Sequence, residues 1–111
     1  MSSLHYLNEK LSDAIYTLTV HEGDACTRLA RVLPKLKILT ITSFPKDLQK
    51  DFIYTKEIID KGLKHYNINN SPNYPLPAKL TGIRNSTARK AIEKLVKIQF
   101  ELSCLLEDNK L

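Results

Sequence analysis

The chain contains no tryptophan and only three glycines and two cysteines. Nucleotide-binding loops need several glycines at fixed spacing, so a nucleotide site of that kind is excluded. Cys26 and Cys104 are too few and too far apart in the sequence for a disulfide framework, and they form no CxxC pair. We therefore expect two reduced thiols.

Patterns typical of metal binding and catalysis are also missing. The histidines, His5, His21 and His65, are widely separated. Neither HxxxH nor Glu-x-x-His occurs, the spacings that place metal ligands on one face of a helix. The acidic residues have the spacing of solvated helix faces. The sequence therefore predicts no metal, no cofactor and no enzymatic activity.

Long apolar runs are lacking, and none approaches the roughly 18 residues of a transmembrane helix. Residues 1–13 carry no basic segment before an apolar one, so they do not form a signal peptide. These absences predict a cytoplasmic protein with no membrane partner. The length of 111 residues, with 42% hydrophobic and 26% charged residues, is typical of one globular domain spanning residues 1–111.

Apolar residues at helical spacing are abundant. They predict a first helix over residues 4–19, with Ser2 or Ser3 as its N-cap and Gly23 after its end. Its apolar face comprises Leu4, Leu7, Leu11, Ala14, Ile15 and Leu18.

A second helix is predicted from Asp24, whose carboxylate suits a helix N-terminus. Pro34 interrupts it, because proline lacks the backbone N–H and clashes with the preceding turn. The apolar spacing continues through Pro34, so we expect a kink and not a break. The β-branched stretch over residues 36–43 has no partner strand, so we expect a helix end followed by a loop.

A third helix is predicted to begin after Ser43 as N-cap, with Phe44 and Pro45 in its first turn and Gly62 near its end. Its apolar face comprises Leu48, Phe52, Thr55, Ile59 and Leu63. Residues 67–77 are rich in asparagine and proline, which predicts a loop.

The last helix is predicted over residues 78–107, with a break near Gly82 as the alternative. Its apolar stripe comprises Leu80, Ala91, Leu95, Ile98 and Leu102. Four amphipathic helices joined mostly by short loops predict an all-α four-helix bundle.

Arg84 falls inside this stripe, together with Thr87. In the simplest interpretation Arg84 packs its stem while its guanidinium reaches water. In a second it forms a salt bridge to Asp51 or Glu57. If the helix breaks at Gly82, a third interpretation is an anion or partner site at a new helix N-terminus. That site would comprise Arg84, Asn85, Ser86, Thr87, Arg89 and Lys90, with Asn85 or Ser86 as the N-cap.

Two surface features bear on partners. The formal net charge is +5, and Arg89, Lys90, Lys94 and Lys97 share the polar side of the last helix. Four apolar residues fall off the core stripes and predict an interface: Ile53, Tyr54, Val96 and Phe100.

These features together favour a small non-enzymatic helical bundle that acts through protein–protein interaction, with a protein partner or its own copy. One alternative is a nucleic-acid-binding or regulatory protein that uses the basic face of the last helix. The other is a small-anion-binding protein centred on Arg84.

Overall fold

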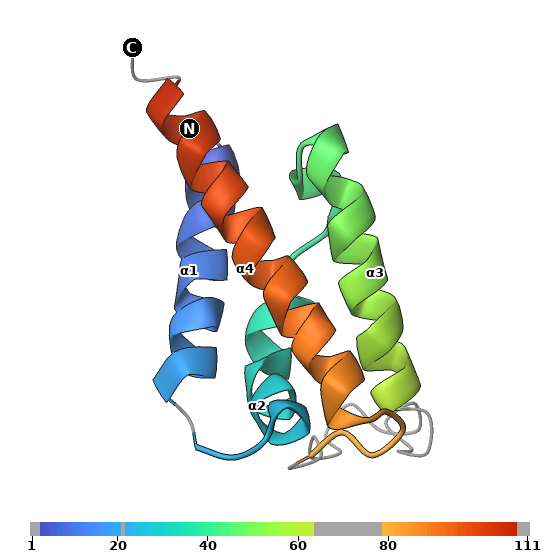
Figure 1. Ribbon diagram of the computed structural model, residues 1–111. Coiled ribbons are helices and arrows are strands. Elements are labelled where there is room, and N and C mark those ends of the chain that lie inside the picture. The colour runs from blue at the N-terminus through green and yellow to red at the C-terminus, as the bar shows by residue number, and fades with distance from the viewer. Residues whose placement is uncertain (1–2, 21, 64–78, 109–111) are drawn as a thin grey trace.

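The computed structural model describes residues 3–20, 22–63 and 79–108. These residues form α-helices and one short 3₁₀ helix and contain no strand, so the prediction of an all-α four-helix fold is confirmed (Figure 1). The elements in chain order are α1 (Ser3–Val20), α2 (Ala25–Lys37), the 3₁₀ helix η1 (Ile41–Ser43), α3 (Lys46–Gly62) and α4 (Asn85–Asp108).

Helix α1 buries the predicted apolar face. Leu7, Leu11, Ala14 and Leu18 are buried, and Leu4 and Ile15 pack against the core while partly exposed. Ser3 is already the first helical residue, so it is not the N-cap, and Ser2 lies outside the described residues.

Helix α2 begins as predicted, with Asp24 as its N-cap. The backbone N–H of Thr27 donates to Asp24 Oδ1 at 3.0 Å. Pro34 lies inside the helix, which continues beyond it to Lys37, so the proline does not divide α2. A bend at Pro34 stays a prediction. The chain then forms a loop and η1, not a strand, as expected.

Helix α3 begins two residues later than its predicted cap implies. Its N-cap is Pro45, whose carbonyl accepts hydrogen bonds from the backbone N–H groups of Leu48 and Gln49. Ser43 instead ends η1, and its hydroxyl bonds to that of Thr40 at 2.6 Å. The predicted Ser43 cap is therefore wrong. A residue that precedes proline is kept out of the helical region, so the helix can start only after Phe44.

The predicted apolar face of α3 is confirmed, because all of its residues are buried: Leu48, Phe52, Thr55, Ile59 and Leu63. The hydroxyl of Thr55 donates to the Asp51 carbonyl at 3.0 Å, which satisfies the one polar group on this face. Phe44 stacks on Phe52 with ring centroids 4.2 Å apart.

The last helix begins at Asn85, so the prediction of one helix from residue 78 is wrong and the break near Gly82 is correct. The backbone N–H groups of Thr81 and Gly82 donate to the Gly62 carbonyl at 3.3 Å instead of continuing a helix. A Cβ on Gly82 would lie 1.9 Å from the Lys61 carbonyl oxygen, so only glycine fits there. Leu80 is nevertheless buried, as its place in the stripe predicts.

Helix α4 occupies the centre of the fold. Figure 1 shows it running between α1 and α3 with α2 behind it, and it packs against all three. Helices α1 and α2 also pack on each other, and α3 packs on α4 and η1. The backbones of helices α2 and α3 do not approach each other closely within the described residues.

Candidate functional site

Arg84 lies outside the core. It is exposed and stands at the N-cap position of α4, where its carbonyl accepts from the backbone N–H groups of Thr87 and Ala88 at 3.1 and 3.0 Å. Because the helix begins after Arg84, the apolar periodicity of α4 does not apply to its side chain. Arg84 therefore has the sequence spacing of the apolar stripe, but its side chain does not lie on the buried face of α4.

The two carboxylates predicted to pair with Arg84 do not form a salt bridge with it. Asp51 is engaged by Lys94 at 3.2 Å and by Lys97 at 3.3 Å. Glu57 is exposed on α3. No ion pair of Arg84 occurs among residues 3–20, 22–63 and 79–108.

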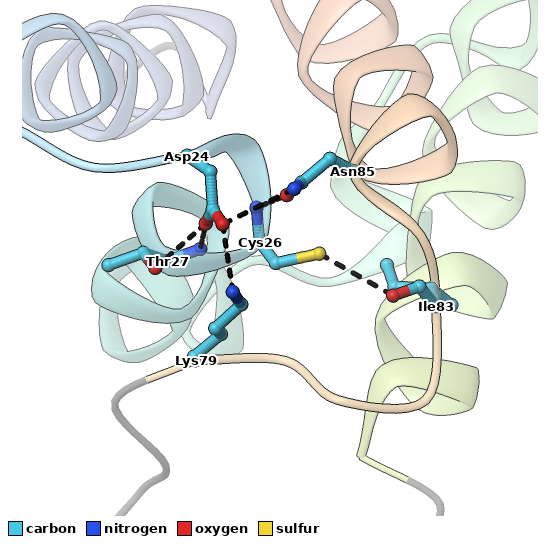
Figure 2. Close-up of polar contacts among 6 residues, drawn as sticks. All are labelled: Asp24, Cys26, Thr27, Lys79, Ile83 and Asn85. Carbon is cyan, nitrogen blue, oxygen red and sulfur yellow. Dashed lines mark hydrogen bonds and ion pairs between the residues drawn. The ribbon is translucent and has the colours of Figure 1, made fainter.

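Asn85 connects two helices instead of capping its own. It is the first residue of α4, so the prediction of Asn85 or Ser86 as N-cap is wrong by one or two positions. Its Oδ1 accepts from the backbone N–H of Cys26 at 3.1 Å, and its Nδ2 donates to Asp24 Oδ2 at 3.2 Å (Figure 2). Asn85 thus satisfies an N–H group at the start of α2 that has no partner within the helix. Ser86 is exposed and Thr87 is partly buried.

Asp24 is the centre of this contact. Its Oδ1 accepts from Thr27, and its Oδ2 accepts from Lys79 Nζ at 2.8 Å as well as from Asn85. The Lys79 ammonium, followed by the Thr27 groups, holds the pKa of the Asp24 carboxyl far below its usual range. The same pairing raises the pKa of Lys79.

The thiol of Cys26 belongs to the same cluster. It is buried and donates to the Ile83 carbonyl at 3.6 Å (Figure 2). Burial, and then the neighbouring Asp24 carboxylate, raise the pKa of this thiol, so it stays protonated and is a poor nucleophile. We call the cluster the joint, and define it as Asp24, Cys26, Thr27, Lys79, Ile83 and Asn85. Its contacts hold the starts of α2 and α4 and the segment between Lys79 and Ile83 together.

The predicted basic face of α4 has two parts. Arg89 and Lys90 are exposed near the start of the helix. Lys94 and Lys97 instead form ion pairs with Asp51 on α3. Burial pushes the pKa of Asp51 upward, but the hydrogen bonds from both lysines outweigh it and hold the pKa below its usual value. Two of the four cations therefore link helices.

The four residues of the predicted interface are exposed, from 38% for Tyr54 to 65% for Phe100. Tyr54 faces α4, because the Lys94 ammonium lies 5.7 Å from its ring centroid. Ile53 is rotated by about 100° from Tyr54 around the helix and faces elsewhere. Val96 and Phe100 are one turn apart and share one side of α4. The set is therefore not one continuous patch.

Sequence reasoning missed a pocket of about 200 Å³ between α2 and α3. Its lining combines apolar side chains with three charged ones: Leu33, Leu36, Phe52, Ile59, Leu63, Lys37, Lys56 and Asp60. We call it the slot. The apolar residues of the slot have the helical spacing of ordinary core residues, so the sequence does not distinguish them from the core. The charged residues next to them are the one feature of the sequence that could have indicated the slot. The opening depends on how α3 is placed relative to α2, which the periodicity of each helix does not determine.

The described residues contain no group of three or more potential metal ligands. No helix formed by those residues is both long and apolar enough to cross a membrane. No protein family model, curated protein or solved structure matches the chain.

Proposed function

We propose that the protein acts by binding, not by catalysis, and that it associates with a second copy of itself through the exposed side of α4. The observation that carries this proposal is the pair Val96 and Phe100, which are 46% and 65% exposed one helical turn apart. Exposed aromatic side chains beside an aliphatic one are typical anchors of protein interfaces.

The charges of α4 indicate the kind of partner. Arg89 and Lys90 lie near its start, and Glu101 and Glu107 lie near its end, with Val96 and Phe100 between the two groups. This order is unfavourable for a single helix, because the helix dipole favours acidic residues at the start and basic residues at the end. The first turn of α4 has no acidic residue and its last turn has no basic one.

An antiparallel pair of α4 helices would compensate for this order. In a two-fold dimer the same surface of each copy meets its equivalent. Arg89 and Glu107 each lie seven residues from the Val96–Phe100 pair, on the same side of the helix, so each arginine would approach the partner's acidic end. The apolar pair would lie at the centre of the interface, where water is excluded.

The groups with shifted pKa values support binding over catalysis. Asp24, Lys79 and Cys26 belong to the joint, and Asp51 links α3 to α4. Structural contacts thus account for each of these pKa shifts. The pKa of a catalytic residue, in contrast, is usually shifted to suit its role in the reaction.

The experiment is a charge swap read by sedimentation velocity at micromolar concentration. Arg89→Glu alone and Glu107→Lys alone should each weaken the dimer, because each places like charges opposite one another. The two single variants mixed together should form a heterodimer, because their charges are then complementary. Phe100→Ser should abolish association, and Lys50→Glu on α3 is the matched control for charge reversal at an exposed site.

A wild-type protein that stays monomeric at high micromolar concentration would refute the proposal, as would single variants that associate like the wild type. The nucleic-acid alternative depends on Arg84, Arg89 and Lys90, since Lys94 and Lys97 are engaged by Asp51. Retardation of duplex DNA that falls steeply with salt would favour it, because each neutralised phosphate releases counterions.

A further inference from the structure

The slot between α2 and α3 combines apolar walls with charged residues. Its walls are the apolar side chains of Leu33 and Leu36 on α2 and of Phe52 and Ile59 on α3. Each of these residues is less than a tenth exposed, so each presents only a small apolar surface to an occupant. A slim apolar group fits such an opening, whereas a helix of a partner protein does not.

Its volume limits the size of an occupant. At about 200 Å³ the slot is somewhat larger than an apolar cavity of about 150 Å³ that binds benzene, and smaller than the roughly 300 Å³ at which sites for drug-sized molecules begin. We therefore expect the apolar part of a bound ligand to be one aromatic ring or a short alkyl chain.

The mouth of the slot carries charge from both helices. Lys37 comes from α2 and Lys56 comes from α3. The Lys56 ammonium lies 6.0 Å from the ring centroid of Phe52, which places it over an apolar wall of the slot. Within the described ranges neither lysine forms an ion pair, whereas Lys35, Lys79, Lys94 and Lys97 do.

Asp60 also lines the slot, so the three charged residues together leave one net positive charge there. That net charge is balanced by a single negative charge, which a monoanion such as a carboxylate supplies. A carboxylate head also accepts hydrogen bonds from ammonium groups directly.

From the apolar walls, the volume and the two lysines, we infer that the slot binds a small monocarboxylic acid with a slim apolar body, such as a short fatty acid or an arylacetic acid. This site is separate from the exposed side of α4. Loss of self-association would leave it intact, and loss of acid binding would leave the dimer intact.

The test uses the full chain with hexanoate and phenylacetate as probes and 1-hexanol as the uncharged analogue, followed by isothermal titration and by amide chemical shifts. We expect both acids to bind with about millimolar affinity or tighter and to shift resonances of residues that line the slot. Hexanol should bind about fivefold more weakly than hexanoate, because it lacks the charge that the lysines attract.

Lys37→Met and Lys56→Met separate this site from general attraction to a basic protein. The double variant keeps the apolar stems, so it should lose about fivefold in affinity for hexanoate while its affinity for hexanol is unchanged. Lys50→Met, on the same helix as Lys56 but outside the slot, should bind both probes like the wild type. The inference is overturned if neither acid shifts resonances of the slot, if hexanol binds as well as hexanoate, or if all three lysine variants behave alike.

Discussion

Helix α2 takes part in two contrasting contacts. At its start the joint connects it to α4 through Asn85 and to the preceding segment through Lys79. Farther along, Leu33 and Leu36 face α3 across the slot, and no close approach of the two helices closes it. The difference teaches that polar side chains determine the geometry at one end of α2, whereas apolar periodicity alone does not bring α2 and α3 into close contact.

The largest effect should come from Gly82→Ala beside the joint. The new methyl group would lie 1.9 Å from the Lys61 carbonyl oxygen, and the atoms it would meet are backbone atoms, which cannot rotate away as a side chain can. We expect a loss of about 3 kcal/mol or more in the free energy of unfolding, measured by urea denaturation. Gly62→Ala is the comparison and should cost less, because the atoms nearest its new methyl group belong to the side chain of Leu80, at 3.0 Å, and not to backbone. Equal losses would show that the close approach at Gly82 is not rigid.

Asn85→Ala should have the next largest effect. It removes the acceptor of the Cys26 backbone N–H and one donor to Asp24. Leaving a partly buried donor without an acceptor costs about 1–3 kcal/mol, and we expect about 1.5 kcal/mol here. Ser86→Ala, at the neighbouring exposed position, should change stability by less than about 0.5 kcal/mol. If both variants unfold at the same urea concentration, Asn85 does not connect the helices.

The joint should also make stability depend on pH. The folded protein holds the pKa of Asp24 far below its unfolded value of about 3.9. The stabilisation is therefore complete above pH ~4 and is lost as the pH falls toward the folded pKa. Urea denaturation between neutral and acidic pH should show this loss, which should be smaller in Asp24→Asn. Asp51 contributes in the same direction, so some acid sensitivity should persist in the variant.

The sequence predicts much of the fold because apolar spacing reports burial directly. Leu95, Ile98 and Leu102 are each 0% exposed, as their stripe on α4 predicts. Asp24 was also predictable as a cap, since the carboxylate bonds within its own helix. Such local features need no knowledge of other helices.

The start of α4 and the slot could not be predicted in the same way. Asn85 bonds to Cys26, which is far away in the sequence, and Gly82 is required by a close approach to Lys61. The slot likewise depends on the distance between two helices that are each regular. Helical periodicity carries no information on such long-range contacts, so Arg84 appeared to face the core.

The slot should tolerate a larger side chain. Ile59 is a wall of the slot, and Ile59→Phe would extend into about 200 Å³ of space. We expect unfolding free energy to change by less than about 1 kcal/mol, whereas the same change at Ile98, which is 0% exposed, should cost about 1–3 kcal/mol. Thermal denaturation of both variants distinguishes the two environments. Similar losses would mean that the slot is as tightly packed as the core.

The smallest effect should come from Arg84→Met, next to the joint but outside its contacts. The Arg84 carbonyl, not its guanidinium, accepts the first hydrogen bonds of α4, and methionine keeps that carbonyl. The side chain is exposed, so we expect unfolding free energy to change by less than about 1 kcal/mol.

The same variant tests the anion alternative. Phosphate bound at Arg84 would raise the melting temperature of the wild type more than that of Arg84→Met. Sulfate and phosphate also stabilise proteins by exclusion from the surface, so chloride and Lys50→Met serve as controls. We expect all three proteins to respond alike, because Arg84 is exposed at the start of α4 and a pairing of exposed charges contributes little. A phosphate response confined to chains that retain Arg84 would show that Arg84 binds the anion. A loss of unfolding free energy above roughly 3 kcal/mol in Arg84→Met would show that Arg84 forms a stabilising contact next to the joint.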